Sequence, residues 1–538
     1  MASSRLIPLA LLALPSLVWA EDLQPLPDKE KSVTVSKILV VSHPIFDESA
    51  EDTFFLHNWA NFLHINTKEQ TVRNNLSFKE GDVISEQEMA EAQRILRAEH
   101  YLRDSRITVA EKDPLAPSTN EDVVVVETWD NWSLLPTLSF SRSGGQNKFS
   151  VGLKEDNLLG LGIGTRLKYQ STQDRTGYKL AVDSPVNWLP HARISADIYD
   201  NSDGQAARLF FIKPFFTLDG NNQYSIDWLK DTRDDTLRRN GEDVAGFEHQ
   251  INYFDLHYGT LLSWDSHVSQ RLLFGITQNQ QSFETWEKFP DTELPKDRDF
   301  LYPWIAWEFI EDKHGVFHDI RLINFNEDIN LGWHHFVKLG LETRDIEGNT
   351  PGIHLNWRSS RGFQSTDSLW LLEAGGDALL NTTQADKYNL QLQGEWFYRI
   401  SNKWKLYNRI RLAASKNNFI DEPLTLGDDS GMRGYPDAYQ WGDYLWQATS
   451  EVRYYPNIHL YQLAELGWAM FADAGQAFGG DQALNDVSGP LASVGIGARI
   501  YSSRSSYGNV AHIDFSVPLN RGPGLDSWEW RFLIRSHF

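Results

Sequence analysis

Most of the chain alternates between apolar and polar residues with the two-residue period of a β-strand. From Asn131 to Phe538 short alternating segments recur, separated by turns rich in Gly, Asn, Asp and Pro. One such segment is a weak indication, but a series of roughly eighteen to twenty predicts a large all-β region. Residues 220–300 are the hardest to read, and the charged stretch Asp231–Asp243 within them is expected to be a solvated loop.

The last alternating segment is the clearest. One face is apolar and the other carries charged residues. A soluble sandwich would bury the apolar face, whereas a strand between lipid and an aqueous lumen uses both faces as they are. The pattern therefore predicts a barrel that spans a membrane. The apolar residues are Trp528, Trp530, Phe532, Ile534 and Phe538, and the polar ones are Glu529, Arg531, Arg535 and His537.

Before Asn131 the pattern is mixed. A strand is followed by two helices and two more strands, which predicts a small α/β domain over residues 33–129. The second helix has a marked start, because Ser85 can cap its N-terminus and Glu88 completes a capping box. The predicted segments are Val33–Val41, Phe54–Ile65, the helix after Ser85, Ser105–Ala110 and Asp122–Thr128.

The N-terminus predicts export. Arg5 precedes the apolar run Leu6–Val18, and Ala20 offers a small-residue cleavage site, so residues 1–20 are expected to be a signal peptide. Residues 21–32 form a short polar lead. Since no later apolar run has the length of a transmembrane helix, a barrel is the expected way of crossing a membrane.

The composition agrees with a barrel and argues against several classes of function. Aromatic residues make up 13% of the chain although only 41% of residues are hydrophobic, as expected when alternate residues face lipid and aromatics line both interfaces. On composition alone, a large soluble β-protein is an equal alternative. The net charge of −23 argues against nucleic acid as a partner. The absence of cysteine excludes disulfides, thiolate metal sites and a cysteine nucleophile.

Two stretches near the C-terminus break the alternation. Leu424–Tyr435 reads L-T-L-G-D-D-S-G-M-R-G-Y and is predicted to be an ordered loop, in which the three glycines, Gly431 among them, allow positive φ. Phe471–Gly475 places an aspartate, Asp473, in an otherwise apolar strand. Together they suggest a loop that folds back onto the interior face of a strand.

The side-chain faces predict how loop and strand meet. Asp473 shares its face with the small residues Gly467 and Ala469, which leave room for a loop, and Glu451 on another strand also points away from lipid. We therefore predict that Arg433 lies inside the barrel within hydrogen-bonding reach of Asp473, with Glu451 as a second or alternative partner. The guanidinium fork suits this role because it binds a carboxylate through two bonds.

The order of these features resembles the POTRA-barrel superfamily of outer-membrane proteins, the bacterial surface antigen family that contains BamA, TamA and the two-partner-secretion transporters. The small domain resembles a POTRA (polypeptide-transport-associated) module, with its Gly81-Asp82 turn before the capped helix. The other matches are Arg433-Gly434-Tyr435, the strand motif with Phe471, Asp473 and Gly475, and the terminal strand that ends at Phe538. Two departures are a single POTRA domain and a lead too short for the plug helix of the secretion transporters.

The resemblance implies a fold and a function. The fold is a barrel of sixteen antiparallel strands over residues 130–538, with residues 416–443 as a loop folded into the lumen. The function is non-enzymatic insertion or translocation of unfolded outer-membrane or secreted polypeptides in the outer membrane of a Gram-negative bacterium. Outer-membrane lipid surrounds the barrel, the POTRA domain lies in the periplasm, no cofactor or metal is involved, and periplasmic or lipoprotein partners are open. The alternatives are a passive porin-like channel, a secretion pore for a dedicated passenger, and an outer-membrane hydrolase.

Two surfaces are expected to handle the client. The first is the sheet edge formed by Ser105, Arg106, Ile107, Thr108, Val109 and Ala110, to which an unfolded chain can add a strand. The second is the seam between the first barrel strand, Leu134–Phe140, and the last, Trp528–Phe538. Pro136 removes one ladder donor there and weakens the pairing.

Two groups that look chemical have simpler explanations. His314 and His318 are four apart, but Gly315 and the flanking strand segments argue against the helix that a metal-ligand pair would need. Ser430 lies in a glycine-rich stretch without the G-x-S-x-G spacing of a hydrolase.

Overall fold

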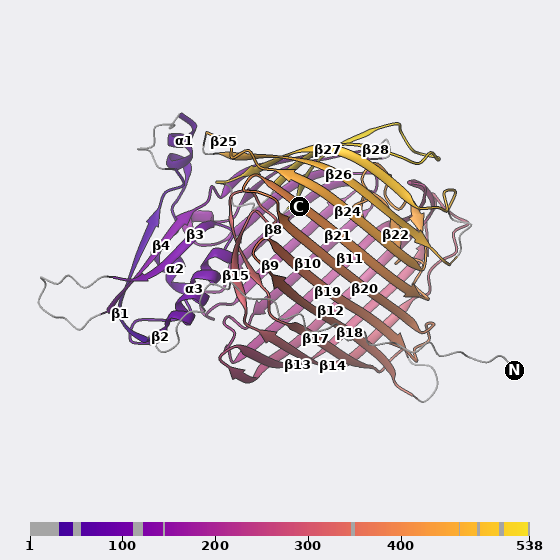
Figure 1. Ribbon diagram of the computed structural model, residues 1–538. Coiled ribbons are helices and arrows are strands. Elements are labelled where there is room, and N and C mark those ends of the chain that lie inside the picture. The colour runs from indigo at the N-terminus through magenta and orange to yellow at the C-terminus, as the bar shows by residue number, and fades with distance from the viewer. Residues whose placement is uncertain are drawn as a thin grey trace, which may run out of the picture.

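The computed structural model describes residues 32–46, 55–110, 122–143, 146–345, 350–461, 463–480, 485–504 and 510–535. The predicted signal peptide, the lead before Ser32, and Phe538 lie outside these residues. A small mixed domain stands at one end of a large barrel (Figure 1). We call the barrel end beside the small domain the near rim and the opposite end the far rim.

The small domain is a four-stranded sheet with helices against it. The strand order is β2-β1-β4-β3, with β1 and β4 parallel and the other pairs antiparallel. The sequence pattern predicts three strands; the fourth, β2, has only three residues, which are too few to show alternation. The elements are β1 (Ser32–His43), α1 (Phe55–Leu63), α2 (Glu69–Asn74), β2 (Val83–Ser85), α3 (Glu86–Ala98), β3 (Leu102–Val109) and β4 (Asp122–Asp130).

Helix α3 covers this sheet and builds its core. Ala92 and Leu96 on α3 are buried in one cluster with Val35, Val124 and Val126 of the sheet. The predicted capping box is confirmed: Glu88 N donates to Ser85 Oγ at 3.2 Å, and Ser85 N donates to Glu88 Oε2 at 2.6 Å. Such a cap stabilises a helix by about 1 kcal/mol, so the start of α3 is fixed by its own sequence.

The barrel is a closed antiparallel meander. Its sheet contains 21 strands, and β25 is a two-residue strand beside β26, which leaves 20 in the wall of the described chain. The first ten are β5 (Leu134–Ser143), β6 (Gln146–Glu155), β7 (Gly164–Ser171), β8 (Thr176–Pro185), β9 (Arg193–Asn201), β10 (Gly204–Lys213), β11 (Asn222–Arg239), β12 (Glu242–Asp265), β13 (Val268–Thr285) and β14 (Arg298–Glu311). The others are β17 (His334–Glu342), β18 (Gly352–Gln364), β19 (Ser368–Leu380), β20 (Lys387–Arg399), β21 (Trp404–Lys416), β24 (Tyr444–Tyr454), β25 (His459–Leu460), β26 (Ala464–Phe478), β27 (Leu491–Ser502), β28 (Val510–Pro518) and β29 (Glu529–Arg535).

The expected count of sixteen strands is therefore wrong. That number came from the resemblance, whereas alternation alone gave eighteen to twenty segments, which agrees with the structure. The stretch Asp231–Asp243 is also corrected, because it belongs to β11 and β12 rather than to a solvated loop. Ion pairs such as Arg238 with Asp243, at 3.1 Å, hold these charged residues within a long hairpin.

Strand length varies around the wall. β11 and β13 each have 18 residues and β12 has 24, whereas β5 has 10 and β28 has 9. The seam, where β29 lies beside β5, is therefore built from short strands and the opposite wall from long ones. Fewer paired residues mean fewer hydrogen bonds along the ladder, so β29 makes fewer of them with its neighbours than β11 makes with β12.

The outer face of the barrel is apolar and its inner face is polar. On β26, Trp468 and Met470 are 52% and 53% exposed, whereas Ala469, Phe471 and Asp473 between and after them are buried. Exposed apolar side chains recur in this way on most wall strands. An apolar outer band around a polar lumen is the arrangement of a barrel that spans a membrane.

Two segments fold into the lumen. The first, which we call the lumen hairpin, joins β14 to β17 and contains β15 (His314–His318) and β16 (Asn326–Asn330). Its tip residues Leu322 and Ile323 are buried against Tyr455 and Tyr501 of the wall. The second, which we call the lumen loop, joins β21 to β24 and contains β22 (Thr425–Leu426) and β23 (Gln440–Trp441).

Helix α3 joins the small domain to the near rim. Arg97 donates two hydrogen bonds to Asp328 of the lumen hairpin, with Nη2 to Oδ1 at 2.7 Å and Nε to Oδ2 at 2.8 Å. Gln87 donates to Asp312 at 3.2 Å. Figure 1 accordingly shows α3 beside β15 at the mouth of the barrel.

Candidate functional site

The lumen loop turns sharply at two glycines. Gly431 has φ of 97° and Gly434 has φ of 86°, conformations that L side chains rarely adopt. A Cβ on Gly434 would lie 3.3 Å from Ser516 Oγ and 3.5 Å from Pro518 Cδ on β28. The backbone at Gly434 therefore lies directly against the inner wall, and this aims Arg433 toward β24 and β26.

Arg433 lies inside the barrel between two carboxylates. Its Nε and Nη2 donate to Oδ2 and Oδ1 of Asp473 at 2.6 and 2.8 Å, and its Nη1 donates to Glu451 Oε1 at 2.6 Å. The guanidinium also stands over the ring of Phe471, 3.5 Å from its centroid. Burial alone would lower the pKa of Arg433, but the charges of Asp473 and Glu451 outweigh burial and raise it, so the group stays charged.

Apolar contacts fix the remainder of the loop. Leu426, Met432, Tyr435 and Tyr439 are fully buried in one cluster with wall residues such as Leu491. The Tyr435 hydroxyl lies 2.7 Å from the carbonyl oxygen of Ala492 and 2.7 Å from Asn520 Oδ1. Gly475, the end of the strand motif, packs near the side chain of Leu426. The loop is thus bound to the wall on both sides of Arg433.

The ion pairs continue beyond the predicted residues. Arg531 of β29 donates to Asp428 of the lumen loop at 2.8 Å and to Asp514 of β28 at 3.1 Å. Arg499 of β27 donates to the same Asp514 at 2.6 Å. On the other side, Arg453 of β24 donates to Glu451 at 2.9 Å. We call this set of four arginines and four carboxylates the lumen network; its members are Arg433, Arg453, Arg499, Arg531, Asp428, Glu451, Asp473 and Asp514.

Arg453, Arg499 and Asp514 were not among the residues predicted from the sequence. Each is a charged residue on the inward face of an alternating strand, and this was the signal that could have found them. Arg531 was expected to face the lumen and is buried there, as is Glu529. Trp528 is exposed at the far rim.

The lumen network also contacts the lumen hairpin. Arg453 Nη1 donates to the carbonyl oxygen of Ile320 at 3.1 Å, and its guanidinium lies 4.0 Å from the ring centroid of Tyr407. The hairpin in turn holds Asp328, the partner of Arg97 on α3. A continuous series of contacts therefore runs from the small domain, through the lumen hairpin and Glu451, to the lumen loop and β29.

The predicted client edge is β3, an outer strand of the small sheet. Arg106 is exposed, and β4, which holds Val123–Val126, is central, as expected. Part of the edge is already occupied, because Ile107 N donates to Gln93 Oε1 of α3 at 3.0 Å. Ala110 N donates to Val123 O at 2.8 Å, so pairing with β4 continues to the end of the predicted edge.

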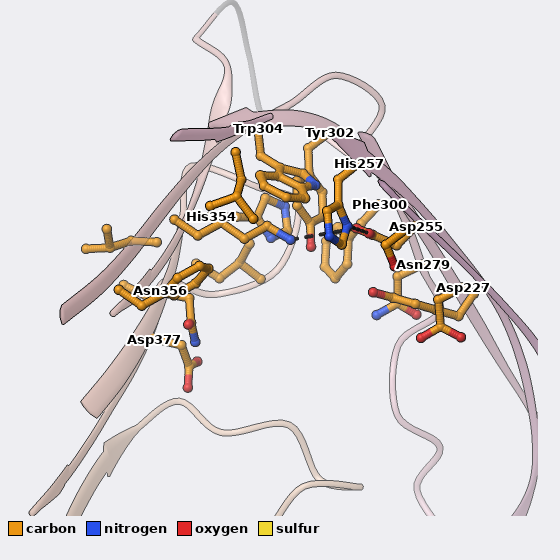
Figure 2. A pocket seen from close by; sticks show the side chains of 18 of the residues that line it. Asp227, Asp255, His257, Asn279, Phe300, Tyr302, Trp304, His354, Asn356 and Asp377 are labelled. Carbon is orange, nitrogen blue, oxygen red and sulfur yellow. Dashed lines mark hydrogen bonds and ion pairs between the residues drawn. The ribbon is translucent and has the colours of Figure 1, made fainter. Parts of the chain in front are cut away.

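A cavity of about 640 Å³ remains in the lumen, along the wall of long strands and the base of the lumen loop (Figure 2). Its lining is aromatic and polar. Lys338 Nζ stands 4.0 Å over the ring of Trp304, and the ring of His354 stacks on Tyr302 at 3.8 Å. Asp255 accepts from Thr277 at 2.6 Å and lies 2.7 Å from His257 Nδ1. These charged groups contact partners in the wall, so the cavity is a polar space beside the loop.

The residues considered as a possible nucleophile or metal ligand make structural contacts instead. Ser430 Oγ donates to Gly427 O and accepts from Gly427 N, both at 2.9 Å, which closes a turn of the lumen loop. His314 Nδ1 lies 2.7 Å from Asp312 Oδ1, and His314 belongs to the strand β15 rather than to a helix. Across the described ranges, no three His, Cys, Asp or Glu side chains are grouped to hold a metal ion. In the same part of the chain, no helix combines the length and apolarity needed to cross a bilayer.

Comparison with known proteins gives only remote likenesses. No family model matches the sequence, and no curated protein sequence matches it. Among solved structures, BamA from Haemophilus ducreyi lacking POTRA domains 1–3 is 11% identical with a TM-score of 0.43, covering 92% of this chain and 83% of that one. CdiB from Escherichia coli is 13% identical with a TM-score of 0.46, covering 93% and 76%. The FrpB iron transporter from Neisseria meningitidis is 8% identical with a TM-score of 0.43, covering 81% and 87%. At these values, likeness to a solved structure does not identify a function.

Proposed function

We propose that this protein is a non-enzymatic outer-membrane barrel that inserts polypeptides into the membrane or passes them across it. The observation that carries the proposal is the series of contacts from α3 to β29. It links a domain outside the barrel to the lumen loop, through Arg97–Asp328, Arg453–Glu451 and Arg433–Glu451, and then to the last strand, through Asp428–Arg531. A passive pore has no need for such a linkage.

The seam is the proposed exit. The short strands β5 and β29 meet there, and the ring of Phe140 stacks on that of Trp530 with centroids 5.4 Å apart. Pro136 of β5 lacks a backbone donor. A seam that opens exposes unpaired N–H and C=O groups in an apolar layer, and an entering strand can satisfy them. The lumen network ends on β29, so movement of the lumen loop acts directly on one side of this seam.

The small domain is the proposed receiver, in the periplasm. An unfolded chain would add along β3, where backbone pairing gives affinity without requiring a particular sequence. Such a strand would compete with Gln93 for the N–H of Ile107. Since Gln93 lies on α3, which also carries Arg97, client binding at the edge would disturb the helix that contacts the lumen hairpin.

Reconstitution tests the proposal. The purified protein in phospholipid vesicles should convert an added unfolded outer-membrane barrel into a protease-resistant, folded form faster than empty vesicles do. The same preparation in a planar bilayer should show small, flickering conductance, because the lumen loop and lumen hairpin occupy the lumen. A large, steady conductance with no effect on client folding would support a passive porin instead. Transfer of a passenger into the vesicle interior would favour secretion over insertion.

A further inference from the structure

Helix α1 exposes aromatic side chains and buries a histidine, which is the reverse of a helix in a soluble domain. His57 and Ala60 are buried, whereas Trp59 is 66% exposed and Phe62 is 85% exposed. The spacing of the exposed pair places both aromatics on one face. A water-soluble domain would bury the aromatics and expose the histidine. The sequence pattern predicts the helix but not this orientation.

Polar contacts hold α1 in this orientation. His57 Nε2 lies 2.6 Å from the carbonyl oxygen of Tyr461, and its ring stacks on Phe46 with centroids 4.4 Å apart. The Asn61 side chain accepts from Phe46 N at 3.2 Å and donates to Phe46 O at 3.0 Å. The buried face of α1 is therefore satisfied by specific partners, so its exposed aromatic face results from defined packing.

Helix α1 stands beside the near-rim end of the apolar band of the barrel (Figure 1). Tyr461 follows β25, in the near-rim turn between β24 and β26, and Figure 1 shows α1 beside β25 at that rim. In the same turn Ile458 and Leu460 are exposed, and β26 continues the band with Trp468. Trp132 and Leu463 pack against the buried cluster of Ile45, Phe46 and the α1 residue Ala60, so the helix stands where β5 begins, at the near end of the seam.

We propose that α1 lies in the interfacial layer of the near membrane leaflet, with Trp59 and Phe62 in contact with phospholipid. Aromatic side chains favour this layer because their rings suit the boundary between headgroups and acyl chains. The helix, F-L-H-N-W-A-N-F-L, carries no Asp, Glu, Lys or Arg, so its insertion depends on apolar area rather than on anionic lipid. The consequence is that the small domain is held against the bilayer beside the seam. This inference stands whatever the barrel transports.

Spin labelling can test the immersion because the chain contains no cysteine. Asn58→Cys places a nitroxide on the exposed side of α1 while both aromatic anchors remain. Arg106→Cys on β3, an exposed strand edge, is the matched control. With the full chain in phosphatidylethanolamine–phosphatidylglycerol vesicles, the label at 58 should collide more with oxygen than with aqueous nickel chelate. The control label should show the reverse, and raising the salt concentration should change neither result.

Two results with the single Asn58→Cys label would overturn the proposal. One is a label at 58 that meets the nickel chelate as freely as the control. The other is a label shielded from both reagents, which would mean that a protein surface covers α1. Adding Trp59→Ser and Phe62→Ser to Asn58→Cys should move the label into water, and no movement would also contradict the proposal. If that variant does not fold, the label in the otherwise native chain decides alone.

Discussion

Arg433 binds Asp473 through two parallel hydrogen bonds, Nε to Oδ2 at 2.6 Å and Nη2 to Oδ1 at 2.8 Å, while its third nitrogen reaches Glu451. All three side chains are buried. Removing one partner of such a pair leaves an unmatched buried charge, which typically costs about 3–5 kcal/mol. We expect Arg433→Ala and Asp473→Ala each to lower the stability of the folded barrel by that amount, measured by urea unfolding in vesicles.

The double variant makes this prediction specific. Because both single changes break the same contact, Arg433→Ala with Asp473→Ala should cost little more than either alone. Arg433→Lys should lower the stability of the barrel by less than Arg433→Ala does, since lysine keeps the charge but not the two-bond geometry. Fully additive losses would mean that the two residues act independently.

Gly434 should tolerate no side chain. Its φ of 86° is costly for an L-residue, and a Cβ would come within 3.3 Å of Ser516. We expect Gly434→Ala to destabilise the lumen loop by about 1–3 kcal/mol and to increase the conductance of the barrel. Gly489→Ala is the control, because a Cβ there meets no atom within 4 Å. Equal effects of the two substitutions would contradict this account of the loop.

The contact between Arg97 and Asp328 should hold the lumen hairpin in place. Arg97→Ala and Asp328→Ala should each raise the frequency of open events in a planar bilayer, because either change releases the hairpin from α3. Exchanging the two charges, with Arg97→Asp and Asp328→Arg together, should partly restore the low frequency of open events. Arg73→Ala is the control, since Arg73 pairs with Glu69 and Glu80 inside the small domain. Unchanged conductance in all variants would show that the hairpin does not depend on α3.

The β3 edge should capture clients. A photo-crosslinking amino acid at Arg106 should join to an unfolded client, whereas one at Gln70 on α2 should not. Gln93→Ala frees the N–H of Ile107 and should therefore raise the yield at Arg106. Capture only from helical positions would exclude strand addition along this edge.

The sequence predicted the local features well where one principle decided them. Alternation predicted that Asp473 faces inward, and the Ser85–Glu88 spacing predicted where α3 begins. The lumen hairpin was not predicted, because its strands β15 and β16 have the same short alternating pattern as wall strands. The sequence of a short strand does not indicate whether the strand pairs within the wall or inside the lumen.

One wrong assignment and one missed orientation have physical causes. The stretch Asp231–Asp243 was assigned to a loop because charges on both faces hide the alternation. In the structure these charges pair with one another, Arg238 with Asp243 across the hairpin at 3.1 Å and Arg233 with Asp231 and Asp235 on its own strand at 2.8 Å. For α1, periodicity predicts an apolar face but not what covers it. The hydrophobic pattern is the same whether that face meets a protein core or lipid.

If clients leave through the seam, a covalent bridge between β5 and β29 should stop them. Phe140→Cys with Trp530→Cys, joined by a short bis-maleimide, would bridge β5 and β29 where their rings now stack. Leu392→Cys with Leu412→Cys, which are paired across β20 and β21, is the matched control away from the seam. We expect the seam bridge to abolish the vesicle-assisted folding of an added client barrel, and the control bridge to leave it unchanged. Undiminished folding with the seam bridged would show that clients do not leave between β5 and β29.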